Sequence, residues 1–486
     1  MNILYATSEA APFCRSGGLA DVAGSLPPAL AKQGDQVAVI LPLYQSVADC
    51  FSKSAELKME FVKWTYVRLA WRSVYCGLFR ARYRDVDWYF LDNEYYFHRP
   101  ELYGYYDDAE RFGFFSRAVT EMLPDLSVKP DVVHCNEWQT ALIPIYIHDE
   151  AVRTAFFRDI RTVFTIHNIE YQGRYGRSLL EDLFGLPPGW YDEGTLAYEG
   201  DINLLKGAIV NVDAVTTTSR TYAQELKYAY YAHGLERVIS ACGDKLRGVP
   251  NGIDVRSFDP QHDEALARTY GEASLDGKAA CKRALQEELG LEQRADAPIV
   301  AMISHLVSPK GLDLVCETLE EMLEQDVQFV LLGRGDAQYE SFFRDAAQRH
   351  PGRMAVRLEH PDHSQPLSRR IYAGADLFLI PSKIEPCGAS QMIAMRYGAV
   401  PIVRETGGLK DAVCKNGEHE ARGVSFANYN AQDMLRGVRE AINLYRDDPA
   451  AYRTLQKRGM TADDFSWERC AEEYHKIYQQ LYAKKS

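Results

Sequence analysis

The tripeptide Gly-Gly-Leu occurs twice in this sequence, each time between a predicted strand and a predicted helix. The two copies are residues 17–19 and residues 407–409. Glycines at such a turn let backbone N–H groups approach an anion, and the N-terminus of the following helix adds a favourable potential. Neither copy is the dinucleotide fingerprint G-x-G-x-x-G or the P-loop G-x-x-x-x-G-K-[ST]. A tight turn explains a single Gly-Gly pair at least as well, so neighbouring residues must decide between the two interpretations.

Charged side chains lie beside these turns or at equivalent strand ends. Arg15 precedes the first turn and supplies a fixed cation where a phosphate would lie. Lys310 follows the predicted strand 299–303, and Glu385 follows the predicted strand 376–380. Ligands bind at the carboxyl ends of parallel strands, where a carboxylate can accept hydrogen bonds from sugar hydroxyls and favour developing positive charge. A solvated loop lysine and a carboxylate at a helix N-terminus are the structural alternatives.

Other polar and aromatic residues are weaker candidates when each is taken alone. His167 ends the predicted strand 162–166, again at a carboxyl edge, and Asn251 belongs first to a turn. His305 by itself is typical of a structural histidine. Residues 61–106 are rich in Trp and Tyr, whose faces suit sugar rings although most such residues form core. We expect one or two of these aromatic residues to contact a glycan.

Two short patterns resemble metal-binding motifs without the context that metal ligation needs. Asp85 and Asp87 form a D-x-D pattern, but the alternation from Tyr83 to Leu91 predicts an exposed strand face there. The segment 360–363, His-Pro-Asp-His, lacks a helical context for metal ligands. We therefore expect no metal site.

Composition and charge restrict the class of protein. A chain of 486 residues predicts two or three domains, and 46% hydrophobic with 25% charged residues is typical of a globular protein. The net charge of −13 argues against nucleic-acid and anionic-membrane partners. The ten cysteines are scattered without a C-x-x-C pair, the first residues do not resemble a signal peptide, and no apolar run reaches about 20 residues. These features predict a cytoplasmic protein.

Strand and helix patterns alternate along both halves of the chain, which predicts an α/β fold with parallel sheets. The first half begins with a strand, a loop, a helix over residues 19–32 and a second strand. A charged, helical stretch over residues 260–295 precedes the second half, and a last helix, from about residue 467, is expected to pack back on the first half. The predicted domains are residues 1–250, 251–460 and 461–486.

Seven motifs occur in a fixed order and together are far more specific than any one of them. With them the sequence resembles the bacterial glycogen synthases and plant starch synthases over essentially the whole chain. The motifs are SGGLADV from Ser16, FTIHNIEYQG from Phe164, NGID from Asn251, KGLDL from Lys310, EPCG from Glu385, TGGL from Thr406 and DFSW from Asp464.

The resemblance implies a fold of two Rossmann-like domains that face each other across a cleft, the GT-B glycosyltransferase arrangement. The first domain would bind the acceptor and the second the nucleotide sugar. The implied reaction transfers glucose from ADP-glucose to the non-reducing end of an α-1,4-glucan, with retention of configuration and without a metal or other cofactor. The leaving phosphate oxygen would take the acceptor proton.

The resemblance also implies three groups of site residues. Lys310 would hold the donor phosphates, Glu385 would bind hydroxyls of the donor glucose, and His167 would contact the sugar close to the reacting carbon. A cation beside the departing diphosphate and a carboxylate beside an oxocarbenium-like sugar suit the charges of that transition state. The catalytic group is His167, Glu385 and Lys310; the nucleotide-sugar group is Arg15, Gly17, Gly18, Asn251, His305, Lys310, Thr406, Gly407 and Gly408; the acceptor group is Glu137, Tyr95 and Tyr171.

Four residues depart from the family pattern at site positions. Arg15 replaces a lysine, His305 replaces the arginine of Ser-Arg-Leu, and Glu137 and Gln139 stand in the family's Asp-Trp-His. Loss of a guanidinium removes a charge-assisted contact worth about 1.5–3 kcal/mol, and the extra methylene of Glu137 can shift the acceptor. Two alternatives therefore stay open: a related transferase with another nucleotide-sugar donor, and a catalytically weak paralogue that binds glucan or nucleotide.

Overall fold

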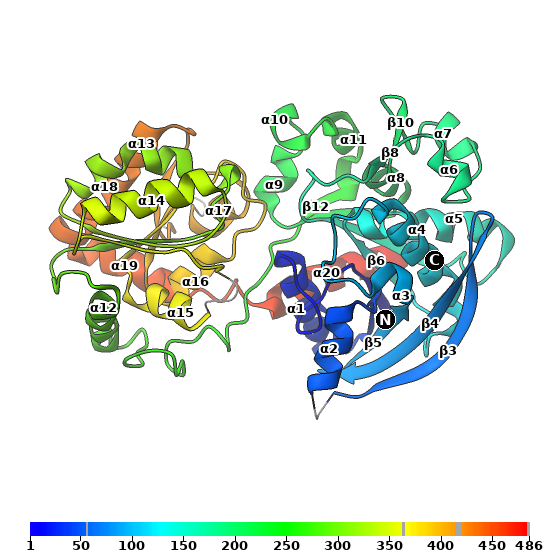
Figure 1. The fold of residues 1–486 in the computed structure, drawn as a ribbon, viewed down its shortest axis with the longest axis horizontal. Helices are drawn as coiled ribbons and strands as arrows, with labels where there is room; N and C mark the ends of the chain where they lie inside the picture. The colour runs from blue at the N-terminus through cyan, green and yellow to red at the C-terminus, as the bar shows by residue number, and fades with distance from the viewer. Residues whose placement is uncertain (55–56, 362–364, 415–419, 484–486) are drawn as a thin grey trace. The chain divides into compact units, whose positions relative to one another are not determined.

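The structure, a computed structural model, describes all of residues 1–486 except 55–56, 362–364, 415–419 and 484–486. The chain forms two compact units; the sheet of unit 1 is mostly parallel and the sheet of unit 2 is wholly parallel (Figure 1). Unit 1 comprises residues 1–218, 223–251 and the chain from residue 467 on, and unit 2 comprises residues 219–222 and 252–466. The chain thus returns to unit 1 at its C-terminal end.

Unit 1 contains a nine-stranded sheet in the order β12-β11-β7-β6-β1-β2-β5-β4-β3. Its strands pair in parallel except for β5 with β4 and β4 with β3. From β1 the chain goes first to β2 on one side and later to β6 on the other, so the topological switch point lies between β1 and β6. The strands are β1 (Asn2–Ala6), β2 (Gln36–Pro42), β3 (Met59–Leu69), β4 (Arg72–Tyr83), β5 (Val86–Asp92), β6 (Val132–Asn136), β7 (Arg161–Ile166), β11 (Ala214–Thr217) and β12 (Leu246–Gly248), and a small separate sheet holds β8 (Arg174–Tyr175), β9 (Ala197–Tyr198) and β10 (Asp201–Asn203).

Most helices of this part of the chain join strands that follow one another in the sequence, and α20 follows the last strand of the chain. Helix α1, for example, lies between β1 and β2 and buries Val22, Leu26 and Leu30. None of the described helices is long and apolar enough to cross a bilayer. The helices are α1 (Gly18–Lys32), α2 (Gln45–Lys53), α3 (Glu94–Phe97), α4 (Asp108–Met122), α5 (Leu142–Arg153), α6 (Leu179–Asp182), α7 (Gly189–Asp192), α8 (Leu204–Asn211), α9 (Arg220–Glu225), α10 (Ala229–Ala232), α11 (Glu236–Ala241) and α20 (Trp467–Ala483).

A buried polar network holds α20 on unit 1. The two ring nitrogens of His134, in β6, lie 2.7 Å from the hydroxyl of Tyr478 and 2.6 Å from the hydroxyl of Thr165. The hydroxyl of Tyr474 lies 3.3 Å from that of Thr216 in the same network. Burial lowers the pKa of His134 to about 3, so its ring is neutral and offers one donor and one acceptor nitrogen.

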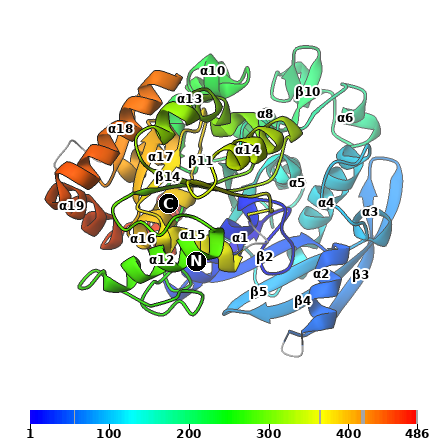
Figure 2. The same ribbon diagram turned by 60° about the vertical axis from the view of Figure 1, so that its left-hand side comes forward.

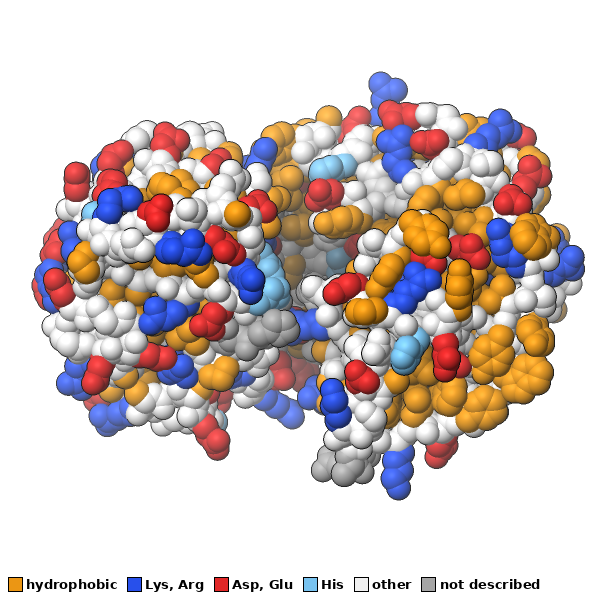
Figure 3. All heavy atoms as spheres, viewed as in Figure 1, with side chains coloured by type: hydrophobic (Ala, Val, Ile, Leu, Met, Phe, Trp, Pro, Cys, Tyr) orange, Lys and Arg blue, Asp and Glu red, His pale blue; other side chains and the backbone are white. Residues whose placement is uncertain are grey.

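The β3-β4 hairpin extends the sheet (Figure 2), and hydrophobic side chains gather on its outer face (Figure 3). Trp64 and Tyr66 are 56% and 59% exposed, whereas Val67 and Leu69, which follow them in β3, are buried. The rings of Trp64 and Tyr75 lie 6.4 Å apart at 30°. The aromatic segment expected to be mostly core is therefore divided between the interior and this exposed face.

Unit 2 contains a six-stranded, wholly parallel sheet in the order β15-β14-β13-β16-β17-β18. Its switch point lies between β13 and β16, because β14 follows β13 on one side and β16 lies on the other. Two separate apolar clusters cover its two faces, one with α13, α14 and α18 and the other with α12, α15 and α16 (Figure 1). The elements are α12 (Asp276–Leu289), β13 (Ile299–Ile303), α13 (Leu312–Leu323), β14 (Gln328–Leu332), α14 (Ala337–Arg349), β15 (Met354–Arg357), α15 (Gln365–Gly374), β16 (Leu377–Ile380), α16 (Ser390–Arg396), β17 (Val400–Arg404), α17 (Gly407–Val413), β18 (Val424–Phe426), α18 (Ala431–Asp447) and α19 (Pro449–Met460).

The predicted α/β fold with parallel sheets is confirmed, with two local differences. The helical stretch expected over 260–295 is reduced to α12, and residues 260–275 form turns and irregular chain. The single strand expected from Tyr83 to Leu91 is instead the end of β4, a turn and β5, because Arg84 and Asp85 adopt positive φ angles of 49° and 62°. Asp85 of the D-x-D pattern therefore lies in a turn.

Candidate active site

In unit 2, three neighbouring strands bring candidate residues to one edge of the sheet. Lys310 follows β13, Glu385 follows β16, and the second Gly-Gly turn follows β17. Lys310 Nζ lies 2.7 Å from Glu385 Oε2, and the Ser382 hydroxyl donates to the same oxygen at 2.9 Å. This ion pair joins loops on both sides of the switch point, which is where open α/β sheets bind ligands.

The second Gly-Gly turn is packed against the loop that carries Glu385. The backbone N–H of Gly408 donates to the carbonyl oxygen of Glu385 at 3.1 Å. A methyl group on Gly407 would lie 2.0 Å from that oxygen, and one on Gly408 would lie 1.7 Å from the carbonyl oxygen of Cys387. Gly407 also has a φ of +42°, which favours glycine. Contact between two backbone segments therefore requires glycine at both positions.

The other candidate residues of the nucleotide-sugar group lie in different surroundings. Thr406 is fully buried as the N-cap residue of α17. His305 follows β13, and its ring centroid lies 4.9 Å from that of His360 in an edge-to-face arrangement. Asn251 is 7% exposed and is the last residue of a unit 1 segment. The contacts of unit 2 thus join Lys310 directly to Glu385 and place the His305 ring against a second histidine.

In unit 1, the first Gly-Gly turn is held by a carboxylate that the sequence did not suggest. Glu9 lies in the loop after β1, and its Oε2 accepts hydrogen bonds from the Ser16 backbone N–H at 2.5 Å and the Ser16 hydroxyl at 2.7 Å. Glu9 is only 3% exposed. Burial raises the pKa of Glu9, and hydrogen bonds from Ser16 and Gly17, with the charge of Arg15, oppose that shift. In the sequence, only its position seven residues before Ser16 could have indicated Glu9.

His167 is held from the end of the neighbouring strand β6 by two consecutive residues. Its ring Nε2 lies 3.0 Å from Asn136 Oδ1, which also accepts from the Tyr5 hydroxyl at 2.9 Å. Its backbone N–H donates to Glu137 Oε1 at 2.5 Å, and the N–H of Asn168 donates to the same oxygen at 2.9 Å. Desolvation lowers the pKa of His167 to about 4, so the ring is neutral at physiological pH.

Glu137 is a buried, strained residue in this structure. It is 7% exposed and has a φ of +62°, a conformation that costs free energy for a residue other than glycine and that often accompanies functional sites. Burial raises the pKa of Glu137 to about 8, although the two N–H groups that it accepts lower it. Its carboxylate oxygen is engaged by the backbone at residues 167 and 168, so its observed contacts fix the loop of His167.

The remaining candidates of unit 1 are open to solvent. Arg15 forms an ion pair with Asp21, Nη2 to Oδ2, at 2.8 Å. Tyr95 and Tyr171 are 69% and 60% exposed, and the guanidinium of Arg99 lies 5.7 Å from the Tyr95 ring centroid. Gln139, in contrast, is 8% exposed within a short 3-10 turn. Both tyrosine rings therefore offer faces that a sugar can reach.

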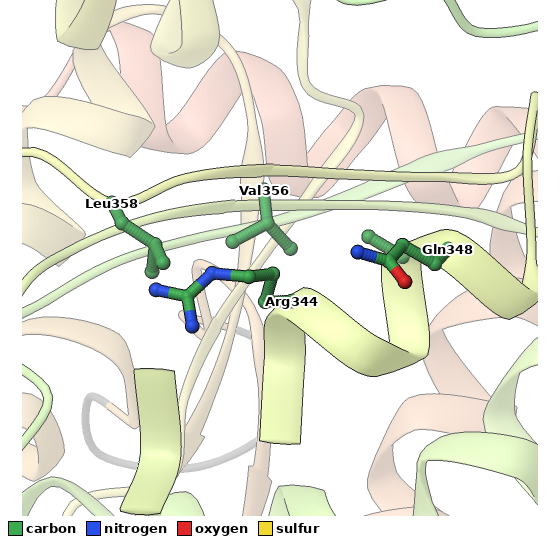
Figure 4. Close-up of a pocket in the computed structure, with 5 residues that line it drawn as sticks. Arg344, Gln348, Val356 and Leu358 are labelled. Carbon is green, nitrogen blue, oxygen red and sulfur yellow. The ribbon is translucent and has the colours of Figure 1, made fainter. Parts of the chain in front are cut away.

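Unit 2 also has a surface hollow that is lined by other residues (Figure 4). It is formed where α14 runs beside β15 and its following loop, and its walls are largely aliphatic. None of the candidate residues contributes to it. The lining residues are Arg344, Ala347, Gln348, Val356 and Leu358.

The two metal-like patterns do not form a metal site in the part of the chain that the structure describes. Asp87 forms ion pairs with Arg80 and Arg82 at 3.0 and 3.1 Å, which fixes it on the β4-β5 surface. Asp362 and His363 of the second pattern lie outside the described residues. Among the residues described, no group of three or more His, Cys, Asp or Glu side chains is arranged to hold a metal ion.

Two sheets of mainly parallel strands, each with candidate residues at its switch point, define the class: the chain is a two-domain α/β glycosyltransferase of the GT-B fold. Residues 2–241 match the starch synthase catalytic domain, and residues 288–458 match the glycosyl transferases group 1. The chain belongs to the family of glycogen and starch synthases, which are retaining glucosyltransferases.

Individual relatives are similar to this chain over essentially its full length. It is 45% identical to the glycogen synthase of Geobacillus stearothermophilus, covering 100% of this chain and 98% of the relative. It is 44% identical to that of Alkaliphilus metalliredigens (strain QYMF), covering 99% and 100%. The catalytic domain of starch synthase IV from Arabidopsis thaliana, solved with ADP and acarbose, superposes with a TM-score of 0.88 at 32% identity, covering 99% of both chains. The confirmed resemblance therefore extends to fold and family.

Proposed function

We propose that this protein transfers glucose from ADP-glucose to the non-reducing end of an α-1,4-glucan, with retention of configuration. The curated relatives are glycogen synthases at 41–45% identity, which supports the reaction. ADP in the solved starch synthase supports the adenine nucleotide of the donor. Acarbose in the same structure supports a glucan-like acceptor.

The observation that carries the proposal is the Lys310–Glu385 pair beside the second Gly-Gly turn. A cation and a carboxylate 2.7 Å apart at a switch point can serve the two opposite charges that develop during glycosyl transfer. We assign Lys310 to the diphosphate and Glu385 to the donor glucose. Ser382 keeps a hydrogen bond to Glu385 when Lys310 turns to the phosphates, so the carboxylate stays oriented.

The chemical step needs no residue to change its protonation state. The acceptor 4-hydroxyl oxygen forms a bond to the anomeric carbon as the bond from that carbon to the diphosphate oxygen breaks. The hydroxyl proton passes to the departing phosphate oxygen, so ADP leaves with the proton and the electron pair of the broken bond. Lys310 stabilises the charge on ADP, and Glu385 favours the positive charge that develops on the sugar.

We assign His167 to the donor sugar near the reacting carbon. A neutral imidazole can accept or donate one hydrogen bond without adding charge, and desolvation lowers the pKa of His167 enough to keep it neutral. Asn136 and Glu137 hold its ring and its backbone. The Glu137 carboxylate, first expected to bind acceptor, is therefore proposed to act through His167.

We assign the acceptor glucan to exposed aromatic rings of unit 1, Tyr95 and Tyr171. Both present more than half of their surface to solvent, and aromatic faces suit the apolar faces of pyranose rings. Arg15, Asn251, His305 and Thr406 remain proposed contacts of the nucleotide sugar. A cytoplasmic location and the absence of nucleic-acid and membrane partners also remain proposals.

The direct test incubates the purified full chain with glycogen and either ADP-glucose or UDP-glucose and measures the released nucleoside diphosphate. We expect release of ADP that depends on both substrates. Release only from UDP-glucose would support a transferase with another donor. Glucan binding without release from either donor would support a catalytically weak paralogue.

The assigned roles are tested with Lys310→Ala and Glu385→Ala. We expect each to lower kcat by about 10²–10³-fold, because each removes charge stabilisation that acts in the transition state. Lys410→Ala is a matched control: Lys410 is a lysine of α17 that is paired with Glu405 at 3.2 Å and has no assigned role. Full activity of Lys310→Ala or Glu385→Ala would contradict the assigned roles.

A further inference from the structure

We propose that Glu9 is a positioning residue for the donor diphosphate, because it binds the amide groups of Ser16 and Gly17 and leaves those of Gly18 and Leu19 for the phosphates. The proposal rests on the proposed function, which supplies the diphosphate. It concerns unit 1 alone, and it gives a role to a residue outside the sequence-predicted site.

The contacts of Glu9 are those of a side chain that orders a turn. One oxygen accepts from both the backbone and the hydroxyl of Ser16, at 2.5 and 2.7 Å. The Gly17 N–H contributes a further hydrogen bond to the carboxylate. Hydrogen bonds to an ionised acceptor are stronger than neutral ones, so this carboxylate fixes the direction in which the chain enters α1.

Glu9 is itself held by the loop that follows β1. The Thr7 hydroxyl donates to the Glu9 carbonyl oxygen at 2.8 Å, and the Ala11 N–H donates to the carbonyl oxygen of Ala20 in α1 at 2.9 Å. The loop lies so close to α1 that a methyl group on Gly24 would be 2.4 Å from the Ala11 carbonyl oxygen. The loop is therefore fixed to the same helix whose first turn Glu9 orders.

The glycines of the first turn are not required by contact with any described residue. Gly17 has φ −160° and ψ −161°, an extended conformation that any residue adopts. A methyl group there would be 3.9 Å from Glu9, and a methyl group on Gly18 would meet no described atom within 4 Å. Glycine is used where a ligand approaches the backbone closely, so this open surface indicates a ligand at Gly18.

The first amides of α1 are suited to that ligand. The first N–H groups of a helix have no partner within the helix, and Gly17, as N-cap residue, offers no side chain to cap them. Glu9 accepts hydrogen bonds from N–H groups that precede the helix. The amides of Gly18 and Leu19 form the N-terminal end of α1, where the dipole of this 15-residue helix favours an anion. Arg15, beside the turn, offsets the repulsion between the Glu9 carboxylate and a diphosphate.

The test measures ADP binding by calorimetry and donor kinetics with the full chain. We expect Glu9→Ala to weaken ADP binding and to raise the KM for ADP-glucose by about tenfold, with a much smaller change in the KM for glycogen. Glu9→Gln, which keeps one acceptor oxygen, should restore part of the donor affinity. Hydrogen exchange of the amides at residues 16 and 17 should be faster in Glu9→Ala than in the wild type.

Ser8→Ala is the matched control, because Ser8 is the neighbouring buried residue and its hydroxyl contacts that of Tyr103 at 2.8 Å and not the Ser16 group that Glu9 binds. Equal ADP affinity in Glu9→Ala and the wild type would overturn the proposal. If Glu9→Ala does not fold, Glu9→Gln decides, and an unchanged donor KM overturns the proposal. Failure of the wild type to bind ADP or use ADP-glucose would instead contradict the proposed function.

Discussion

The two Gly-Gly-Leu turns have the same sequence and both stand where a helix begins, yet different physical reasons account for their glycines. In unit 2, Gly407 and Gly408 are required because carbonyl oxygens of Glu385 and Cys387 occupy the space that a methyl group would take. In unit 1, the space beside Gly18 is open. In the same motif, glycine can therefore be required by close contact with another backbone segment in one place and can leave room for a ligand in another.

The charged groups beside the two turns differ in the same way. In unit 2, Glu385 is paired with the cation Lys310, and both side chains keep some exposure. In unit 1, Glu9 is buried beside the first turn and accepts hydrogen bonds from Ser16. Glu137, which is also buried and whose pKa is raised to about 8 by burial, lies instead beside His167 and accepts the N–H groups of residues 167 and 168. We infer that Lys310 and Glu385, at the edge of the unit 2 sheet, are the charged groups that act on the substrate. The buried carboxyl groups of unit 1 instead fix the positions of neighbouring groups.

The largest expected effect comes from Gly408→Ala. Its methyl group would be 1.7 Å from a backbone oxygen, so the loop of Glu385 must move and unit 2 must lose stability. We expect a fall of more than about 3 kcal/mol in the free energy of unfolding, comparable with severe overpacking, together with loss of glucosyl transfer. Thermal unfolding and ADP release measure the two effects.

Gly18→Ala is the matched substitution in unit 1. Alanine at an unobstructed helix start should leave the thermal midpoint unchanged or raise it slightly, since it lowers the entropy of the unfolded chain. It should nevertheless weaken donor binding, because the methyl group enters the space assigned to the phosphates. The comparison fails if Gly18→Ala destabilises the protein as much as Gly408→Ala does.

An intermediate effect is expected for Glu137→Gln, measured as stability against pH. Burial raises the pKa of Glu137 from 4.5 to about 8, so its protonated form is favoured in the folded state. The folded state binds this proton more tightly than the unfolded state does. The stability gained from the protonated Glu137 is therefore complete below about pH 4.5 and is lost as the pH rises through 8. Glutamine cannot ionise, so the variant should gain stability relative to the wild type between about pH 5 and 9, by about 1–3 kcal/mol at the upper end.

Thermal or denaturant unfolding of both proteins at several pH values measures this difference. Glu150→Gln is a suitable control, because Glu150 is a partly exposed glutamate of unit 1 whose carboxylate is paired with Arg117 at 3.0 Å. It should not reproduce the relative gain at high pH. Parallel stability curves for the wild type and Glu137→Gln would show that Glu137 is ionised throughout this range in the folded protein.

The sequence predicted the parallel sheets well, because buried strands such as 299–303 are short apolar runs that end at Gly or polar loops. It also placed Lys310 and Glu385 at carboxyl edges. It could not show that they touch, because that contact depends on β13 and β16 being neighbours across the switch point. The order of strands in a sheet depends on how the whole sheet assembles, and the local sequence pattern of one strand does not reveal it.

The features that the sequence did not predict, or predicted wrongly, also have physical causes. Glu9 was not identified because its partners at Ser16 and Gly17 are reached only when the loop folds back on α1. The β3-β4 hairpin was not predicted because its exposed face carries aromatic residues such as Trp64 and Tyr66, so polar and apolar residues do not alternate along β3. Residues 260–275 were predicted as helix from their charge, but these residues form turns, and the chain becomes helical only at Asp276.

The smallest expected effect is that of Arg15→Lys, which restores the usual residue of the family. The Arg15–Asp21 pair is exposed on both sides, and exposed pairs contribute about 0–1 kcal/mol, so stability should hardly change. Donor affinity should change by no more than a few-fold, because lysine keeps the charge but not the planar donor pair. Calorimetric titration with ADP measures this change. A tenfold or larger change would mean that Arg15, rather than the amides ordered by Glu9, dominates anion binding at the first turn.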